Sequence, residues 1–231
     1  MGEVSAIIVA AGRGRRMGTD IGKQFLPLMG KPVLNYCLEV FEACSGVDDI
    51  VLVVDAKDLD YTRELLRPYG YRKLQRIVVG GAERQHSVYK GLLELKPDTD
   101  IVLVHDGVRP FVSPSILEES IRVARESGCS VAGVPAKDTI KIVDDQGYAV
   151  ATPDRRSLWL IQTPQTFRYE ILLQAHEKAR EENFLGTDDA MLVERLGIPV
   201  KMIMGSYENI KITTSEDMAL GEIILAKRGK I

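Results

Sequence analysis

Short apolar runs rich in β-branched residues recur along this 231-residue chain, and segments with helical periodicity separate them. The runs are continuous rather than alternating, which is typical of strands buried on both faces of a parallel sheet. We expect strands at Val4–Ala10, Ile50–Asp55, Leu74–Val79, Ile101–His105 and Ser130–Pro135. Because right-handed crossovers place helices on both faces of such a sheet, the pattern predicts a doubly wound, mostly parallel, Rossmann-like α/β fold.

The segments between these runs predict helices. Lys31–Cys44 carries apolar side chains on an i, i+3, i+4 stripe and ends before Gly46. Glu83–Leu95 repeats the stripe, and Ile116–Ala124 follows Ser113-Pro114, a typical helix start. Towards the C-terminus we expect two helices, two extended runs and a closing helix, at Tyr169–Glu182, Asp188–Leu196, Val200–Met204, Asn209–Thr214 and from Glu216.

The pattern of buried strands breaks after Pro135. The segment that follows Ala136 reads KDTIKIVDDQGYAVATPDR. Two polar-rich extended runs flank Asp144-Asp145-Gln146-Gly147, which is a hairpin signal. An isolated two-stranded hairpin is only marginally stable in water. Residues 136–157 are therefore either a disordered surface loop or an arm that docks on a second subunit, and we favour the arm.

Composition excludes several classes of protein. The formal net charge of −3 at pH 7 argues against a general nucleic-acid surface, so any basic patch is local. The three cysteines cannot all pair and lie in no metal-type cluster, which favours buried free thiols and a cytoplasmic location. The first residues form neither a signal peptide nor a membrane span. We therefore expect no nucleic-acid partner and no membrane.

Four of the predicted strands end in polar loops, with the sequences AAGRGRRMG, GGAERQHS, HDGVRP and PAKDT. Ligands of open α/β sheets bind outside the carboxyl ends of the strands. Because the carboxyl ends of parallel strands share one edge of the sheet, we expect the four loops to meet there. This convergence predicts a binding site more specifically than any single motif.

The first loop combines glycines with cations, since residues 13–23 hold four basic side chains and one acid. Its glycines miss the GxGxxG spacing by one residue, and the acid that ends the second strand, Asp55, lies too far along for a dinucleotide fold. The GxxxxGK[ST] pattern is also absent. The remaining interpretation is a glycine loop that cradles phosphates, with Arg16 and Lys23 as phosphate ligands rather than surface charges.

Asp106 follows four apolar residues and His105 at the end of a predicted strand. One carboxylate, with phosphate oxygens and waters, commonly holds Mg²⁺, so Asp106 is a candidate ligand of that ion. The alternative is a structural ion pair with Arg109. His105 is better explained as a core or supporting residue than as a catalyst, and the three histidines of the chain do not cluster as transition-metal ligands would.

Several motifs in this order resemble one protein family: AAGRGRRMG with KQFLPL, GGAERQHSV, VLVHDGVRPF, KDT and DR followed by LWLIQTPQTF, TDDAMLVERLG, and NIKITTSEDMALGE. The family is that of the 2-C-methyl-D-erythritol 4-phosphate cytidylyltransferases of the non-mevalonate isoprenoid pathway, and the resemblance spans essentially the entire chain. It implies a single nucleotidyltransferase domain over residues 1–231. That domain would join CTP and methylerythritol phosphate to give 4-diphosphocytidyl-2-C-methyl-D-erythritol and pyrophosphate, with Mg²⁺. It also implies a homodimer in which residues 136–157 of one subunit complete the partner's site.

The resemblance also implies roles for individual residues. Arg16, Lys23 and Lys211 would act on the phosphates, and Asp106 would bind the metal. The nucleotide would be contacted at Ala10, Ala11, Gly12, Gly14, Gly81, Ala82 and Ser87. Relatives can carry aspartate at position 82, whereas this chain has alanine, so only a backbone contact could be kept there. The sugar phosphate would be contacted by Thr139 and Arg155 of the arm, with Arg109, Thr163 and Thr187 as further candidates.

Two other functions stay open on the sequence. Ribitol-5-phosphate cytidylyltransferases share the first loop and NIKIT, although Arg84-Gln85-His86-Ser87 is closer to the methylerythritol enzymes. A non-catalytic nucleotide sensor of the same fold is the second, but it would be expected to lack Asp106 or Lys211, and both are present.

Overall fold

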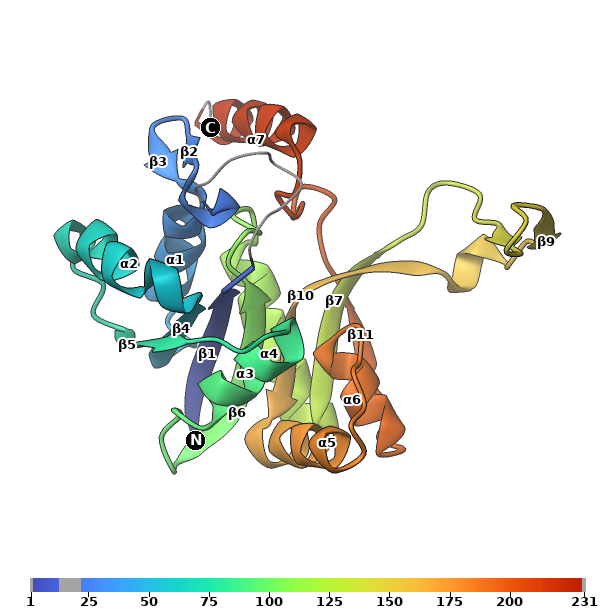
Figure 1. The fold of residues 1–231 in the computed structure, drawn as a ribbon, viewed down its shortest axis with the longest axis horizontal. Coiled ribbons are helices and arrows are strands. Elements are labelled where there is room, and N and C mark those ends of the chain that lie inside the picture. The colour runs from blue at the N-terminus through green and yellow to red at the C-terminus, as the bar shows by residue number, and fades with distance from the viewer. Residues whose placement is uncertain (1, 13–21, 230–231) are drawn as a thin grey trace.

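The computed structural model describes residues 2–12 and 22–229, and within them seven strands form one sheet in the order β11-β7-β10-β6-β1-β4-β5 (Figure 1). The strands are β1 (Glu3–Ala10), β4 (Asp49–Val54), β5 (Leu74–Val79), β6 (Thr99–Asp106), β7 (Cys129–Pro135), β10 (Trp159–Arg168) and β11 (Lys201–Met204). All neighbours pair in parallel except β10, which is antiparallel to both β6 and β7. The predicted mostly parallel α/β sheet is confirmed.

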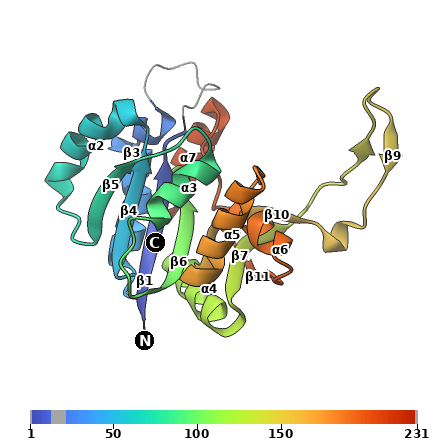
Figure 2. The same cartoon turned by 60° about the horizontal axis from the view of Figure 1, so that its bottom comes forward.

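Helices cover both faces of this sheet. The helices are α1 (Val33–Ala43), α2 (Leu59–Leu66), α3 (Arg84–Leu92), α4 (Pro114–Ser127), α5 (Tyr169–Glu181), α6 (Asp189–Arg195) and α7 (Ser215–Arg228). One face of the sheet packs against α1 and α4, and the other packs against α3, α5 and α6, with α3 and α5 in front of the sheet in Figure 2. In β1, Ile8 faces the first set of helices and Ile7 faces the second, which explains why the apolar runs are continuous.

The predicted helices are present with slightly different ends. The helix predicted at Lys31–Cys44 begins at Val33, because Lys31–Pro32 forms the short strand β3 with β2 (Pro27–Leu28). The helix α4 begins at Pro114 after the Ser113 cap, whose hydroxyl oxygen accepts a hydrogen bond from the backbone N–H of Ile116 at 3.4 Å. The helix α2 is not predicted from the sequence, since its apolar stripe is short: Thr62 and Leu66 are buried, and Leu59 and Leu65 pack partly buried against the core.

The antiparallel strand β10 is also not predicted from the sequence. It contains Pro164, and a proline within a run argues against a central strand because it has no N–H to donate. The pairing between β10 and β7 shifts register between Ile161 and Gln165, so the proline lies at an irregularity of the ladder. The sheet thus accommodates a residue that its sequence pattern disfavours.

Residues after Pro135 form the predicted hairpin, with strands β8 (Ile142–Val143) and β9 (Ala149–Ala151). Figure 1 shows this segment reaching away from the sheet as an extension of β7 and β10. Every residue of β8 and β9 is exposed, including large apolar side chains at Ile142, Val143 and Val150. The hairpin prediction is confirmed, and the docking of the arm on a second subunit stays a prediction.

The extended run predicted at Asn209–Thr214 pairs with no strand of the sheet, and the backbone of Thr214 is extended. Ile212 is buried beside α7, and its N–H donates to the carbonyl of Val108 at 2.8 Å, which ties the segment to the loop after β6. The pattern of β-branched residues therefore reflects burial against α7 rather than a sheet. In the described ranges, no helix combines the length and the apolarity that crossing a membrane requires.

Candidate active site

A cavity of about 630 Å³ opens at the carboxyl ends of β1, β4 and β6. Its walls come from residues that are far apart in the chain: Val9–Gly12, Lys23, Gln24, Asp55, Gly81–Arg84, Ser87, Asp106, Val108 and Lys211. This volume is in the range that takes a nucleotide-sized ligand. Three of the four predicted loops meet here, whereas PAKDT leads into the arm and does not line the cavity.

Glycines let backbone line one side of this cavity. A Cβ atom on Gly80 would lie 2.7 Å from both Ala11 Cβ and Ser87 Oγ, so only glycine allows this approach between β1 and α3. A Cβ on Gly12, by contrast, would meet none of the described residues within 4 Å, so they leave space beside its backbone. Ser87 Oγ accepts a hydrogen bond from Gly81 N–H at 3.0 Å and donates to the carbonyl of Glu83 at 3.1 Å, which shapes the turn.

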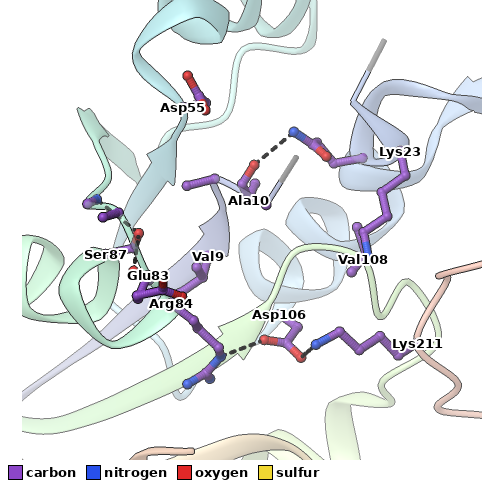
Figure 3. Close-up of a pocket in the computed structure, with 15 residues that line it drawn as sticks. Val9, Ala10, Lys23, Asp55, Glu83, Arg84, Ser87, Asp106, Val108 and Lys211 are labelled. Atoms are coloured by element: carbon purple, nitrogen blue, oxygen red, sulfur yellow. Dashed lines mark hydrogen bonds and ion pairs between the residues drawn. The ribbon is translucent and has the colours of Figure 1, made fainter. Parts of the chain in front are cut away.

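Asp106 lies at the centre of a cluster of cations (Figure 3). Lys211 Nζ lies 2.8 Å from its Oδ2, and Arg84 Nε donates to its Oδ1 at 3.0 Å. Arg109 Nε lies 3.6 Å from Oδ2, an ion-pair distance too long for a hydrogen bond. Burial alone would raise the pKa of Asp106, but Arg84, Lys211 and Arg109 together hold it well below its ordinary value. The carboxylate is therefore ionised at any physiological pH.

Beneath Asp106, a hydrogen-bonded group of polar side chains is buried. Thr163 Oγ1 accepts from the backbone N–H of Asp106 at 3.1 Å and lies 3.0 Å from His105 Nδ1. His105 Nε2 lies 3.1 Å from the carbonyl of Arg109, so the neutral ring carries its proton on Nε2 and accepts from Thr163 on Nδ1. His105 is fully buried and does not line the cavity, as expected for a supporting residue.

The burial of His105 predicts a pH-dependent stability. Burial lowers the pKa of His105 to about 4, whereas an unfolded histidine titrates near ~6.5. The folded state therefore favours the neutral ring, and its stabilising effect is present above pH ~6.5 and lost as the pH falls towards the folded value. Between about pH 7.5 and pH 4.5, we expect urea denaturation to show a fall in unfolding free energy about 2–3 kcal/mol larger for the wild type than for His105→Gln. An equal fall in both proteins would contradict this.

The donor set of the cavity fits a Mg²⁺ ion that is held jointly with ligand phosphates. Within residues 2–12 and 22–229, no group of three or more His, Cys, Asp or Glu side chains could hold a metal ion alone. Asp106 nevertheless offers a hard, ionised carboxylate at the cavity surface. A Mg²⁺ ion held by one carboxylate and completed by ligand phosphates is the common arrangement, and these residues fit it.

Lys23 belongs to a short 3₁₀ helix at Lys23–Phe25, and 9% of its surface is exposed. The neighbouring Gln24 fixes this turn, because its Nε2 donates to the carbonyl of Ala10 at 2.8 Å. The structure thus brings together these predicted site residues: Ala10, Ala11, Gly12, Lys23, Gly81, Ala82, Ser87, Asp106 and Lys211. Arg16 and Gly14 lie outside the described residues.

The predicted sugar-phosphate contacts do not line the cavity within this chain. Thr139 and Arg155 are exposed on the arm, where Arg155 Nη1 donates to the carbonyl of Lys137 at 2.7 Å. Thr187 is also exposed, just before α6. Thr163 is instead buried and Arg109 partly buried beside Asp106, and Arg109 Nη1 donates to the carbonyl of Asn209 at 2.9 Å. As the chain stands, Arg109 and Thr163 support the cavity floor.

Arg84 is a site residue that the sequence analysis missed. It begins α3 directly after the glycine turn and lines the cavity, while its guanidinium bridges Asp106 and the distant Asp189. A basic residue between a Gly-Gly turn and a helix start was the available signal. Asp189, by contrast, lies 105 residues away, and no local pattern connects the two.

Comparisons with known proteins give a consistent result. The model of the family described as 2-C-methyl-D-erythritol 4-phosphate cytidylyltransferase matches residues 4–227. Proteins of that name from Pelotomaculum thermopropionicum and Geotalea uraniireducens are 48% and 51% identical to this chain, over 100% and 96% of it and 98% and 96% of their own lengths. The crystal structure of 4-diphosphocytidyl-2C-methyl-D-erythritol synthase from Anaerococcus prevotii superposes with a TM-score of 0.87 at 34% identity, over 97% of this chain and 96% of that one.

Proposed function

This chain belongs to the 2-C-methyl-D-erythritol 4-phosphate cytidylyltransferase family, and we propose that it joins CTP to methylerythritol phosphate in the cavity around Asp106. The products are 4-diphosphocytidyl-2-C-methyl-D-erythritol and pyrophosphate. One observation supports this location of the site. A single cavity beside a glycine-rich backbone edge is lined by four polar residues from distant segments: Lys23, Arg84, Asp106 and Lys211. Such a cavity suits a triphosphate, since cations and backbone donors both stabilise phosphate oxygens.

The reaction needs charge neutralisation more than it needs a base. An oxygen of the methylerythritol phosphate attacks the α-phosphorus of CTP, one P–O bond forms, and the bond to the pyrophosphate leaving group breaks. The attacking oxygen is already anionic, so no proton has to be removed. This agrees with His105 being buried and outside the cavity wall. The difficulty is the meeting of two polyanions, which positioned cations relieve.

Four cations divide this work in our proposal. Lys23, and with it Arg16 from outside the described residues, binds the triphosphate. Lys211 moves from Asp106 onto the transferring phosphate, because its side chain is 38% exposed and flexible enough to do so. Arg84 stays on Asp106, since it is also tied to Asp189.

Asp106 would hold the Mg²⁺ ion together with phosphate oxygens of CTP. The ion, when bound, neutralises charge on the triphosphate and orients it for in-line displacement. Because Lys211 pairs with Asp106, its departure would leave that carboxylate free to hold the ion. The family name and the ionised carboxylate of Asp106 support this assignment, and the Asp106–Arg109 ion pair that we considered as an alternative is compatible with it.

The base and ribose would lie along the backbone edge formed by Ala10, Ala11 and Gly12 on one side and by Gly81, Ala82 and Ser87 on the other. Gly14 would extend the first side. The space that the described residues leave beside Gly12, and the position of all six of these residues other than Gly14 on the cavity wall, support this assignment. Because the contacts are mostly to backbone atoms, the residue types at these positions do not identify the base that is bound.

We propose that the active enzyme is a homodimer with exchanged arms. Residues 136–157 form a protruding segment of one nucleotidyltransferase domain, and this exposed segment buries little against its own subunit. Docked on a partner, it would bring Thr139 and Arg155 to the sugar phosphate, with Arg109, Thr163 and Thr187 forming the rest of that subsite. The exposed apolar side chains of the hairpin support burial against a second subunit. The buried free cysteines support a cytoplasmic location.

The test is pyrophosphate release from CTP and Mg²⁺, with methylerythritol phosphate and ribitol 5-phosphate offered separately. We expect rapid release with methylerythritol phosphate and at least about tenfold lower kcat/KM with ribitol phosphate, a difference of about 1.4 kcal/mol in transition-state binding. A preference for ribitol phosphate would contradict the proposed substrate. CTP binding without release from either phosphate would indicate a sensor rather than an enzyme.

A further inference from the structure

The guanidinium of Arg84 lies between two buried carboxylates, one inside the cavity and one outside it. Its Nε donates to Asp106 Oδ1 at 3.0 Å, and its Nη1 donates to Asp189 Oδ2 at 2.6 Å. Asp106 lines the cavity, whereas Asp189 lies in the first turn of α6, away from the cavity wall. Arg84 is therefore also bound by Asp189, a residue that a ligand in the cavity does not contact.

Asp189 is itself held rigidly. The backbone N–H groups of Asp189 and Ala190 both donate to Gln165 Oε1 at 3.1 Å, and Gln165 Nε2 donates to the capping residue Asp188 at 2.8 Å. The side chain of Asp189 is 1% exposed. Burial would raise the pKa of Asp189, but Arg84 and His176 hold it below its ordinary value. Asp189 is thus a fixed anion at the start of α6, and Gln165 of the central strand β10 holds its backbone in place.

His176 completes this arrangement from α5. Its Nε2 lies 3.1 Å from Asp189 Oδ1, and its ring is fully buried. Because the ionised Asp189 can only accept, the Nε2 atom of His176 must carry a proton. Among the described residues, His176 Nδ1 has no hydrogen-bond partner, so the hydrogen bond of the ring goes to Asp189. A chain of contacts therefore runs from His176 through Asp189 and Arg84 to Asp106.

We propose that Asp189 and His176 are positioning residues for the nucleotide site and act through Arg84. An arginine side chain has several rotatable bonds, and a single contact with Asp106 leaves its guanidinium free to rotate. The second contact, with Asp189, fixes the plane of the guanidinium beside the triphosphate. It also divides the charge of Arg84 between two carboxylates, so that Arg84 does not neutralise Asp106 completely. The inference rests on the proposed function in placing the triphosphate beside Asp106.

The substitutions Asp189→Asn and His176→Gln test this proposal, since both keep the size and polarity of the side chain. We expect Asp189→Asn to lower kcat/KM for CTP by about 10–100-fold and His176→Gln by less, as when a residue that orients a ligand group is lost. The KM for methylerythritol phosphate should stay within about twofold, because Arg84 faces the nucleotide part of the cavity. Calorimetry should show a matching rise in the Kd of CTP. Asp189→Glu should restore part of the loss, which a general packing role would not allow.

A double substitution separates positioning from folding. If Asp189 acts through Arg84, the double variant Arg84→Lys with Asp189→Asn should lose no more CTP affinity and kcat/KM than Arg84→Lys alone.

Glu182→Gln is the matched control. Glu182 joins α5 to α6 through an exposed ion pair with Arg195 at 2.6 Å, and its substitution should leave the CTP parameters unchanged. Thermal unfolding monitors the fold of every variant, and His176→Gln decides the question if Asp189→Asn does not fold.

Unchanged CTP affinity and kcat in the folded variants, or losses that add to that of Arg84→Lys, would overturn the positioning role. A wild-type chain that binds CTP but does not use methylerythritol phosphate would contradict the proposed substrate alone, because the CTP affinities of the variants still decide the inference. A wild-type chain that does not bind CTP would overturn both.

Discussion

Replacing Lys23 with alanine lowers kcat by about 10²–10³-fold, the loss expected when one preorganised donor to a developing charge is removed. Lys23 lines the cavity and is buried, so its ammonium group acts where solvent screening is weak. The charge that it stabilises is greatest in the transition state, and kcat should therefore change more than KM. Steady-state pyrophosphate release with saturating CTP and methylerythritol phosphate measures this.

Lys31→Ala is the matched control for that variant. Lys31 lies eight residues further along, outside the cavity wall, and its Nζ pairs with Glu39 at 2.6 Å. We expect it to lose at most about 1 kcal/mol of stability and no catalytic rate. A near-normal kcat in Lys23→Ala would remove Lys23 from the mechanism.

Mixing two inactive variants, Lys23→Ala and Arg155→Ala, restores activity if the arm of one subunit completes the site of the other. In a mixed dimer, one cavity keeps its own Lys23 and receives the unchanged Arg155 from the partner, while the second site lacks both. Random exchange makes half of the dimers mixed, so about one quarter of the wild-type activity should return. The experiment mixes the purified proteins, allows subunit exchange, and follows pyrophosphate release.

Two controls make this result decisive. Native mass spectrometry of differently tagged subunits must show that exchange occurs, and mixtures of tagged and untagged Lys23→Ala must stay inactive. Proven exchange without recovery would rule out an arm that works in the partner's site. Arg155 would then act within its own chain or serve only the hairpin, where it already contacts Lys137.

The sheet could be predicted from the sequence because its signal is local. Continuous apolar runs such as Ile50–Val54 are needed wherever both faces of a strand are covered, and every residue of β4 is indeed buried. Features without a local signal were missed. The strand β10 carries Pro164 and two glutamines, and its place between β6 and β7 depends on strands that are distant in sequence. Its proline fits only because the ladder with β7 is irregular there.

Within the site, the sequence by itself determined which residue types stand at the strand ends, because Asp106 and the Gly80-Gly81 turn follow directly from their strands. The local sequence pattern reflects the secondary structure that each segment forms with its neighbours along the chain. Once the strands are parallel, their carboxyl ends lie at the same edge of the sheet. Only the tertiary structure decided which charges meet: it brings Lys211 to Asp106 at 2.8 Å and Arg84 to Asp189 at 2.6 Å. Such pairings depend on burial and distance in three dimensions, which partners more than 100 residues apart do not encode in their local sequence.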